Sequence, residues 1–162
     1  MGVLFDCHTH IHFPAYDSDR ADVLRRAREA GVKMICVGTQ ASTSESAIRL
    51  AEKNPKDVWA TVGFHPNHLA EEWYHDKKEQ SAGEPEEFNI ERLRELAENQ
   101  KVVAIGECGL DYYRLENNRE AQIKKQKAAF EAQIDLAGSL GKALMMHNRP
   151  SKGSAPWGRG SS

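Results

Sequence analysis

The sequence has few cysteines, no long apolar run and almost no net charge, and each scarcity excludes a class of protein. Its three cysteines, Cys7, Cys36 and Cys108, lie far apart without a CxxC pair, which argues against a disulfide framework and favours the reducing cytoplasm. No segment approaches the length of a membrane-spanning helix, and polar residues from Asp6 onward exclude a secretory signal. The net charge of −2 argues against a broad nucleic-acid footprint, although bound metal ions would add positive charge locally.

Five short apolar runs punctuate the chain. Runs of this length, rich in Val and Ile and bounded by Gly or polar residues, are typical of buried parallel strands. They lie at Val3–Phe5, Met34–Val37, Val58–Val62, Val102–Ile105 and Ala143–Met146.

Helical patterns separate these runs and carry boundary signals. One helix is expected to end at Gly31, and the next has capping-box spacing at Ser42 and Glu45. Asn89 is placed to cap a third helix, and a long fourth one ends near Gly141. Alternating strands and helices imply right-handed βαβ crossovers and a parallel sheet. The charged stretch 75–87 interrupts this rhythm and is interpreted as a surface insertion.

Histidines and a glutamate follow four of the five apolar runs. His8 and His10 come after the first, and imidazoles two residues apart in an extended segment point to the same side. His65, Glu107 and His147 follow the third, fourth and fifth runs. Parallel strands of a barrel end on one face, so all five side chains are expected to converge there. Such a set is suited to one or two divalent ions.

Neighbouring residues carry weaker signals with more than one interpretation. Arg149 either forks onto a phosphate oxygen or forms a surface ion pair. Asp111 is expected in a loop. There it either orients the segment that carries Glu107, lines the substrate cleft or caps a turn. Tyr112 and Tyr113 stack on a base or sugar, but core packing is expected for at least one of them.

Three further histidines and one cysteine are expected to take no part in the site. His12 is close enough to the pair His8 and His10 to assist or disturb it. It stands alone in the sequence, however, which favours the interpretation that it has no role in the site. His68 and His75 are interpreted as surface residues. Cys7 is expected in the core, because the alternation of side chains along a strand turns it away from His8.

Four motifs carry a resemblance to a known family. They are Asp6–His10, Val62–Pro66, Gly106–Tyr113 and Met145–Arg149. With them the sequence resembles the TatD family of metal-dependent deoxyribonucleases over about residues 3–151. The run Gly-Glu-Cys-Gly-Leu-Asp-Tyr-Tyr is the most specific of the four.

The resemblance implies a fold, a reaction and roles for particular residues. The fold is a TIM-type (β/α)8 barrel of the metallo-dependent hydrolase superfamily. The reaction is hydrolysis of phosphodiester bonds in DNA with divalent cations, for which Mg²⁺ is expected and Mn²⁺ or Zn²⁺ are alternatives. Glu107 is the expected catalytic residue, and His65 and Arg149 match positions that contact substrate. The positions that match metal ligands are His8, His10, Glu107 and His147.

Departures from the family pattern leave several interpretations open. His12 stands where an Asp or Asn is common. A full barrel needs roughly 250 residues, so residues 1–150 are expected to form a partial barrel of five βα units, followed by a disordered tail at 151–162. A later histidine and the aspartate expected as general base would then be missing. The chain is accordingly a weakly active deoxyribonuclease, a non-catalytic metal-binding fragment, or a related hydrolase of small amides or esters. Its open sheet edges predict self-association.

Overall fold

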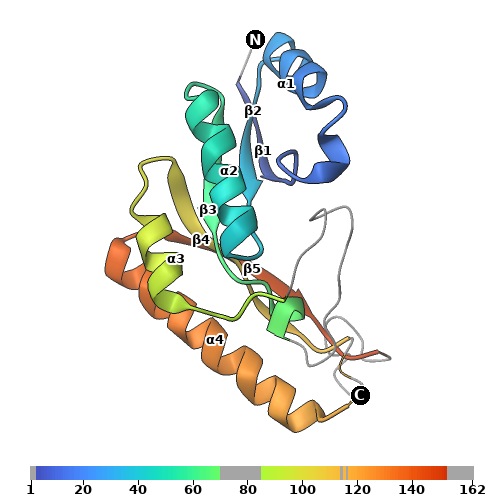
Figure 1. Ribbon diagram of the computed structural model, residues 1–162, viewed down its shortest axis with the longest axis vertical. Helices are drawn as coiled ribbons and strands as arrows, with labels where there is room; N and C mark the ends of the chain where they lie inside the picture. Colours follow the sequence, from blue (N-terminus) through green and yellow to red (C-terminus); the bar gives the residue numbers. More distant parts are fainter. Residues whose placement is uncertain (1–2, 70–84, 114, 116, 153–162) are drawn as a thin grey trace, which may run out of the picture.

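The five predicted strands are present and form one parallel sheet (Figure 1). The computed structural model describes residues 3–69, 85–113, 115 and 117–152. The sheet order β1-β2-β3-β4-β5 follows the chain, and every neighbouring pair is parallel. This is the arrangement of consecutive strands in a barrel, so the expected partial barrel is confirmed, with five strands and the four helices that connect them in the described residues. The strands are β1 (Leu4–Thr9), β2 (Val32–Val37), β3 (Val58–Val62), β4 (Val102–Asp111) and β5 (Ala143–Arg149).

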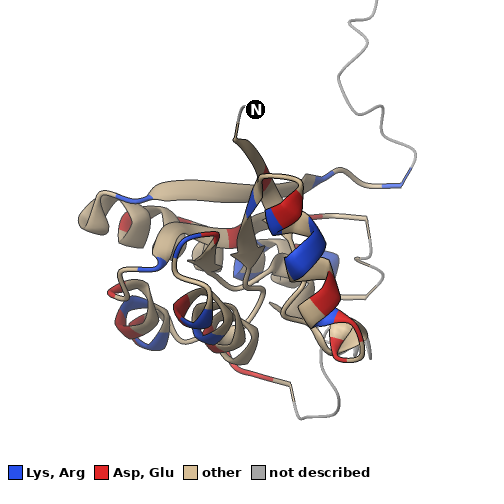
Figure 2. Ribbon diagram, turned by 90° about the horizontal axis from the view of Figure 1, so that it is seen from above, with Lys and Arg blue, Asp and Glu red and all other residues tan. Residues whose placement is uncertain are grey.

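Helices connect the strands and pack on the sheet through a shared apolar core. The core includes Met34 and Val58 from the sheet, and Ile48, Leu93 and Leu136 from three of the helices. Charged residues lie mainly on the helices, while the strands are largely uncharged (Figure 2). The helices are α1 (Arg20–Glu29), α2 (Ala41–Lys53), α3 (Ile90–Ala97) and α4 (Arg119–Leu140), with short 3-10 turns η1 (Pro14–Tyr16) and η2 (Pro66–Leu69).

The two edge strands expose apolar side chains. On β1, Leu4 is 62% exposed and Phe5 is 51% exposed, and on β5 Met146 is 67% exposed. The Phe5 ring lies 5.3 Å from the Trp59 ring, measured between centroids, yet about half of Phe5 stays exposed. The chain thus presents apolar surface at the edges where a closed barrel would continue.

Three strands run further than their apolar runs suggest. Backbone pairing carries β1 to Thr9, β4 to Asp111 and β5 to Arg149, and Asp111 pairs directly with Arg149. The prediction that Asp111 lies in a loop is therefore wrong. A neighbouring strand can pair with any backbone, whatever its side chains, so the apolar run marks only the buried part of a strand.

Cap signals identified two helix ends and one start, but not every cap. Gly31 and Gly141 both have positive φ, 70° and 61°, at the ends of α1 and α4, as expected for C-terminal glycines. The Asn89 side chain accepts a hydrogen bond from the Arg92 N–H, so its predicted capping role is confirmed.

The predicted capping box of α2 is wrong. The helix begins at Ala41, and the reciprocal pair is formed by Gln40 and Thr43. Ser42 instead bonds through its backbone N–H and its hydroxyl to the Glu86 carboxylate. A distant carboxylate was available to Ser42, which the local spacing did not reveal.

Cys7 is exposed rather than buried in the core. It lies on the edge strand β1, whose pairing register shifts between Asp6 and Thr9, so simple alternation does not hold there. Most of the expected insertion at 75–87, with His75, and most of the expected tail at 151–162 lie outside the described residues, which include only 85–87 and 151–152 of these two segments. None of the described helices combines the length and apolarity needed to cross a membrane.

Candidate metal centre

Glu107 is the point on which the predicted ligands converge. Its Oε2 lies 3.4 Å from His8 Nε2, while its Oε1 lies 3.7 Å from His65 Nε2 and 3.1 Å from His147 Nδ1. His10 completes the set, its ring centroid 5.1 Å from that of His8. The five side chains predicted from the sequence therefore lie together.

The ligand atoms fall into two groups that share one carboxylate. One group is His8, His10 and Glu107, and the other is His65, Glu107 and His147, with ligand atoms within 4.8 Å of one another in each. Each Glu107 oxygen faces a different group. A carboxylate shared between two imidazole pairs could hold one or two divalent ions.

Irregular backbone directs these side chains to one place. The β4–β5 register shifts between Ile105 and Cys108, which brackets Glu107, and the β1–β2 register shifts around His8. Such bulges re-aim side chains and are frequent next to active sites. Gly109, at φ 142°, lies so close to β5 that a Cβ would overlap the His147 carbonyl oxygen. Glycine is thus required where β4 approaches the ligand-bearing strand.

His10 is already oriented as a metal ligand would be. Its Nδ1 lies 3.0 Å from the Val37 carbonyl oxygen, and its ring stacks on Phe13 with centroids 4.5 Å apart. A ring that donates from Nδ1 carries its lone pair on Nε2. This is the outer-shell arrangement that commonly fixes ligating histidines.

His65 is set up as a hydrogen-bond donor. Its Nδ1 accepts the Asn67 N–H at 3.1 Å, so in the neutral ring Nε2 carries the proton. Burial has the largest effect on the pKa of His65 and lowers it. The negative charge of Glu107 opposes this effect, but the pKa remains lowered, at about 3. A neutral Nε2–H directed into the centre suits a phosphate oxygen, the role predicted for this residue. If the hydrogen bond from Asn67 is lost, the ring proton can move to Nδ1. Nε2 is then free to join His147 and Glu107 in the second ligand group.

His147 lies between two carboxylates. Its Nδ1 faces Glu107, and its Nε2 lies 3.2 Å from Asp111 Oδ2. The hydrogen bond to Asp111, and then that to Glu107, raise the pKa of His147 to about 9. An imidazole must give up a proton to bind an ion, so metal and proton compete at this ring.

Glu107 remains ionised in spite of its burial. Burial alone would raise its pKa, but the hydrogen bond from His147 and the interactions with the His65, His8 and His147 rings lower the pKa to about 2. The group is therefore a carboxylate throughout the physiological range, the form that binds divalent ions.

Asp111 contacts the candidate centre directly, although the sequence left its role open. Its side chain is covered, and Oδ2 contacts Arg149 Nη2 at 3.0 Å as well as His147. The pKa of Asp111 is lowered: burial opposes ionisation, while hydrogen bonds from His147 and the Tyr113 N–H favour it. Arg149 is thus in an ion pair, one of the two alternatives, although its partner is buried. Its guanidinium also lies over Tyr113, 5.4 Å from the ring centroid.

Neither neighbouring tyrosine packs in the core as expected. Tyr113 is 43% exposed, and Tyr112 is half-buried with the Arg119 guanidinium 5.9 Å from its ring centroid. His68 is half-buried beside His65 rather than on the open surface, with ring centroids 6.1 Å apart.

Two glutamines of α4 hold the ends of β3 and β4. Gln126 accepts the Asp111 N–H and donates to its carbonyl oxygen, both at 2.9 Å. Gln133 makes the same pair with Phe64, at 2.8 and 3.2 Å. The side-chain amides act as an extra strand residue and fix the backbone beside His65 and Asp111.

Comparison with known proteins places this geometry in context. The family model described as TatD related DNase matches residues 5–155. The chain is 40% identical over 147 residues to a Pantoea vagans protein, and 41% identical over 147 residues to one from Pantoea ananatis. Both relatives carry the name 3'-5' ssDNA/RNA exonuclease TatD. The crystal structure of YJJV, a TatD homologue from Escherichia coli, superposes with a TM-score of 0.68 at 30% identity.

The matches cover most of this chain and only part of the relatives. They span 90% of this chain, 50% of each Pantoea protein and 51% of YJJV. The chain therefore spans about half the length of the curated relatives it matches.

Proposed function

The chain belongs to the TatD-related DNase family, and from that premise we propose that it carries the metal centre of a hydrolase that cleaves phosphodiester bonds in DNA. The observation that carries the proposal is Glu107, whose two oxygens face two separate His groups. Bound there, divalent ions would stabilise charge on the phosphoryl oxygens and activate water. The residues proposed to hold them are His8, His10, Glu107 and His147.

The remaining residues of the centre are proposed to bind and orient the substrate. His65 donates a hydrogen bond from Nε2 to a phosphate oxygen, and its burial keeps it neutral. Arg149 has further N–H groups beside those on Asp111, and a guanidinium binds phosphate through its planar fork. Tyr113, exposed beneath Arg149, offers a face on which a base stacks.

Single-stranded DNA or RNA is the proposed form of substrate. The relatives' names support it, since they describe 3'-5' exonucleases of single-stranded DNA and RNA. The exposure of His8 also supports this form of substrate. The His8 side chain is 45% exposed, which leaves room for a phosphate group to approach the centre.

The donor set bears on which ion is bound. Each ligand group offers two imidazoles and one carboxylate. Imidazole nitrogen favours Mn²⁺ or Zn²⁺, whereas Mg²⁺ prefers oxygen and keeps several waters. Mg²⁺ stays a prediction, and the nitrogen-rich set supports Mn²⁺ and Zn²⁺ beside it.

A non-catalytic role is the second candidate. It rests on the finding that the chain spans about half the length of each relative. On this alternative the chain binds metal ions without turnover. Hydrolysis of labelled single-stranded DNA with Mn²⁺, in the presence and absence of chelator, separates the two.

A matched pair of variants sharpens that assay. Glu107→Gln should lower the rate by more than the roughly 10–100-fold that losing an outer-shell partner costs. Glu98→Gln makes the same change at an exposed residue and should leave the rate unchanged. Equal, chelator-sensitive cleavage by both variants would contradict the proposal.

We also propose that the open sheet edges pair with a second copy of the chain. The exposed Leu4 and Phe5 on β1 and Met146 on β5 support this. The three free cysteines, two of them buried, support a reducing compartment, the cytoplasm.

A further inference from the structure

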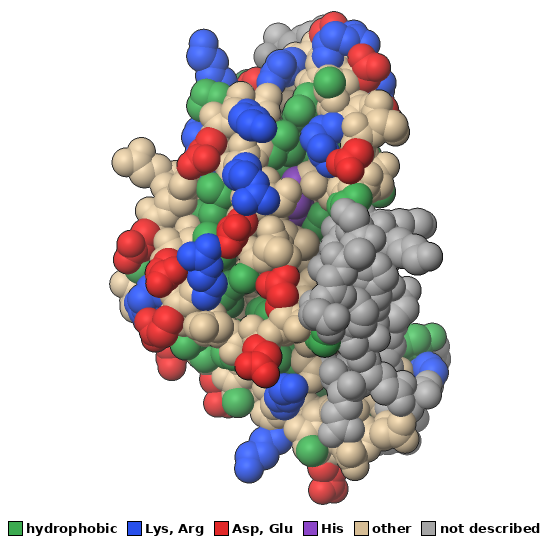
Figure 3. All heavy atoms as spheres, viewed as in Figure 1, with side chains coloured by type: hydrophobic (Ala, Val, Ile, Leu, Met, Phe, Trp, Pro, Cys, Tyr) green, Lys and Arg blue, Asp and Glu red, His purple; other side chains and the backbone are tan. Residues whose placement is uncertain are grey.

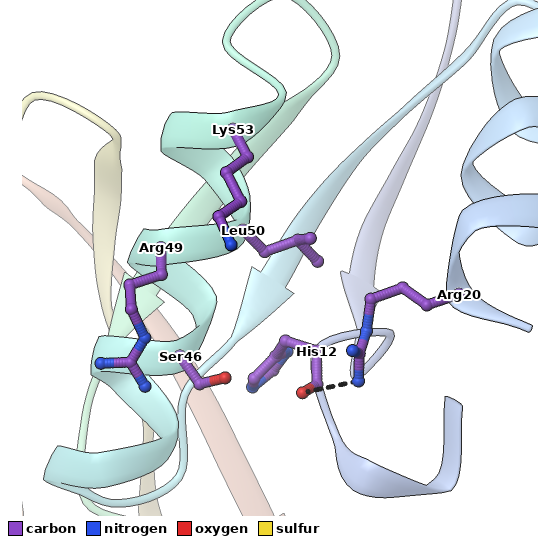
Figure 4. Close-up of a pocket in the computed structure, with 6 residues that line it drawn as sticks. All are labelled: His12, Arg20, Ser46, Arg49, Leu50 and Lys53. Atoms are coloured by element: carbon purple, nitrogen blue, oxygen red, sulfur yellow. Dashed lines mark hydrogen bonds between the residues drawn. The ribbon is translucent and has the colours of Figure 1, made fainter. Parts of the chain in front are cut away.

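A second polar cavity lies outside the metal centre, between α2 and the segment that joins β1 to α1 (Figure 4). Its volume is about 130 Å³, and no acidic side chain is among the described residues that line it. Lys and Arg side chains alternate with Asp and Glu side chains on this face of the molecule, and a small patch of histidine surface lies among them (Figure 3). The lining residues are His12, Arg20, Ser46, Arg49, Leu50 and Lys53.

His12 is buried in this cavity without a polar partner. The residue is only 5% exposed, and neither ring nitrogen has a hydrogen bond. Its ring extends from the β1–α1 segment toward Ser46 on α2, whose hydroxyl points back at it (Figure 4). A buried imidazole almost always has a partner, because an unmade hydrogen bond is costly. The burial of His12 without a partner is the observation from which a role is proposed below.

Three cationic side chains line the cavity, and they differ in their contacts. Arg20 is fixed by bonds to the Ile11 carbonyl oxygen and the Asp17 carboxylate, each 2.7 Å long. Arg49 shares an exposed contact of 3.4 Å with Glu45. Lys53 makes no hydrogen bond or ion pair within the described part of the chain. Arg20 and Arg49 therefore each contact a carboxylate that is not part of the lining, and Lys53 adds a positive charge that no described carboxylate pairs with.

From these contacts we infer that the cavity is an oxyanion site that binds a phosphate group. His12 donates a ring N–H, Ser46 donates its hydroxyl, and Lys53 and Arg49 supply charge. Sites for whole small molecules usually enclose about 300–1,000 Å³. At about 130 Å³ the cavity accepts a phosphate group and leaves any attached nucleoside outside. The inference does not depend on the proposed nuclease activity.

Nuclear magnetic resonance of the whole chain tests the site, with inorganic phosphate as the probe. A chelator present throughout keeps phosphate from binding through metal at Glu107. Phosphate should cause saturable shifts of the His12 ring signals and the Ser46 amide. His12→Gln identifies the ring signals by their loss. No saturable shift at either residue would overturn the inference.

A charge-matched pair of variants separates a site from general attraction. Lys53→Gln should weaken phosphate binding about tenfold, as expected for loss of one charge-assisted contact. Lys56→Gln removes the same charge from an exposed residue outside the cavity and should leave binding unchanged. Equal weakening by the two variants would overturn the inference.

A nucleotide arm identifies the source of the phosphate. Deoxyadenosine monophosphate is titrated under the same conditions. Tighter binding than inorganic phosphate, with the shifts still at His12, supports a nucleotide phosphate as the occupant. Equal or weaker binding at His12 supports free phosphate. Shifts confined to His8 and His147 for both probes would overturn the inference.

Discussion

The imidazole of His147 bridges two carboxylates, with Nε2 3.2 Å from Asp111 Oδ2 and Nδ1 3.1 Å from Glu107 Oε1. The pair raises the pKa of His147 to about 9. The same ring is a proposed metal ligand, so the proton held between the two acids has to leave before an ion binds.

Metal affinity should therefore rise with pH. Below pH 9, displacement of one proton from His147 predicts about a tenfold gain in affinity per pH unit. Asp111→Asn removes the largest cause of the raised pKa and should flatten that dependence. Calorimetric titration with Mn²⁺ from pH 6 to 8 measures it. Affinity that is independent of pH in the unmodified chain would contradict the assigned role of His147.

Acid should destabilise the fold through His65. Its pKa of about 3 in the folded chain lies below the ordinary histidine pKa of 6.5, so the unfolded chain takes up this proton first. Stability is then complete above pH 6.5 and is lost as the pH falls toward 3. Between pH 7 and pH 5 with chelator present, the free energy of unfolding should fall further in the unmodified chain than in His65→Gln, by on the order of 1–2 kcal/mol. Urea unfolding at both pH values measures this, and identical losses in both proteins would refute it.

Gln126 should stabilise both the fold and the centre. Gln126→Leu keeps the volume but leaves the buried backbone groups of Asp111 without partners, at a cost of about 1–3 kcal/mol for each group. Lys127→Leu, at an exposed neighbour on α4, serves as the control. Thermal unfolding should show a marked loss for the first variant only. If both variants melt alike, the backbone contacts of Gln126 contribute little.

The sequence predicted the architecture and the convergence of the histidines on Glu107 better than it predicted the surroundings. Apolar runs located all five strands, and strand-end logic brought His65 to Glu107, although 42 positions separate them in the chain. The bulges at His8 and Glu107 were beyond reach, because register depends on neighbouring strands. Burial of His12 depends on α2, which packs beside it only after folding.

Asp111 and Ser42 show a second reason for the missed contacts. Each residue bonds to a partner at least 36 positions away, His147 and Glu86 respectively. Local spacing gives short polar residues a turn or a cap as the default role. Only tertiary structure decides between that role and a distant carboxylate or imidazole.

Self-association should be measurable and should depend on the edge strands. Light scattering after size-exclusion chromatography is expected to give a mass above that of one 18.2 kDa chain. Phe5→Lys places a charge on the exposed edge strand β1 and should shift the population toward monomer. Glu29→Lys, at an exposed site on α1, should not. A stable monomer for the unmodified chain would contradict the proposed pairing.

The most direct test of the metal centre is a crystal structure of the chain soaked with Mn²⁺, with anomalous diffraction recorded at the manganese edge. We predict two anomalous peaks that share the Glu107 carboxylate, one beside His8 and His10 and one beside His147. Saturating Mn²⁺ with no peak within ligand distance of Glu107 would contradict the account.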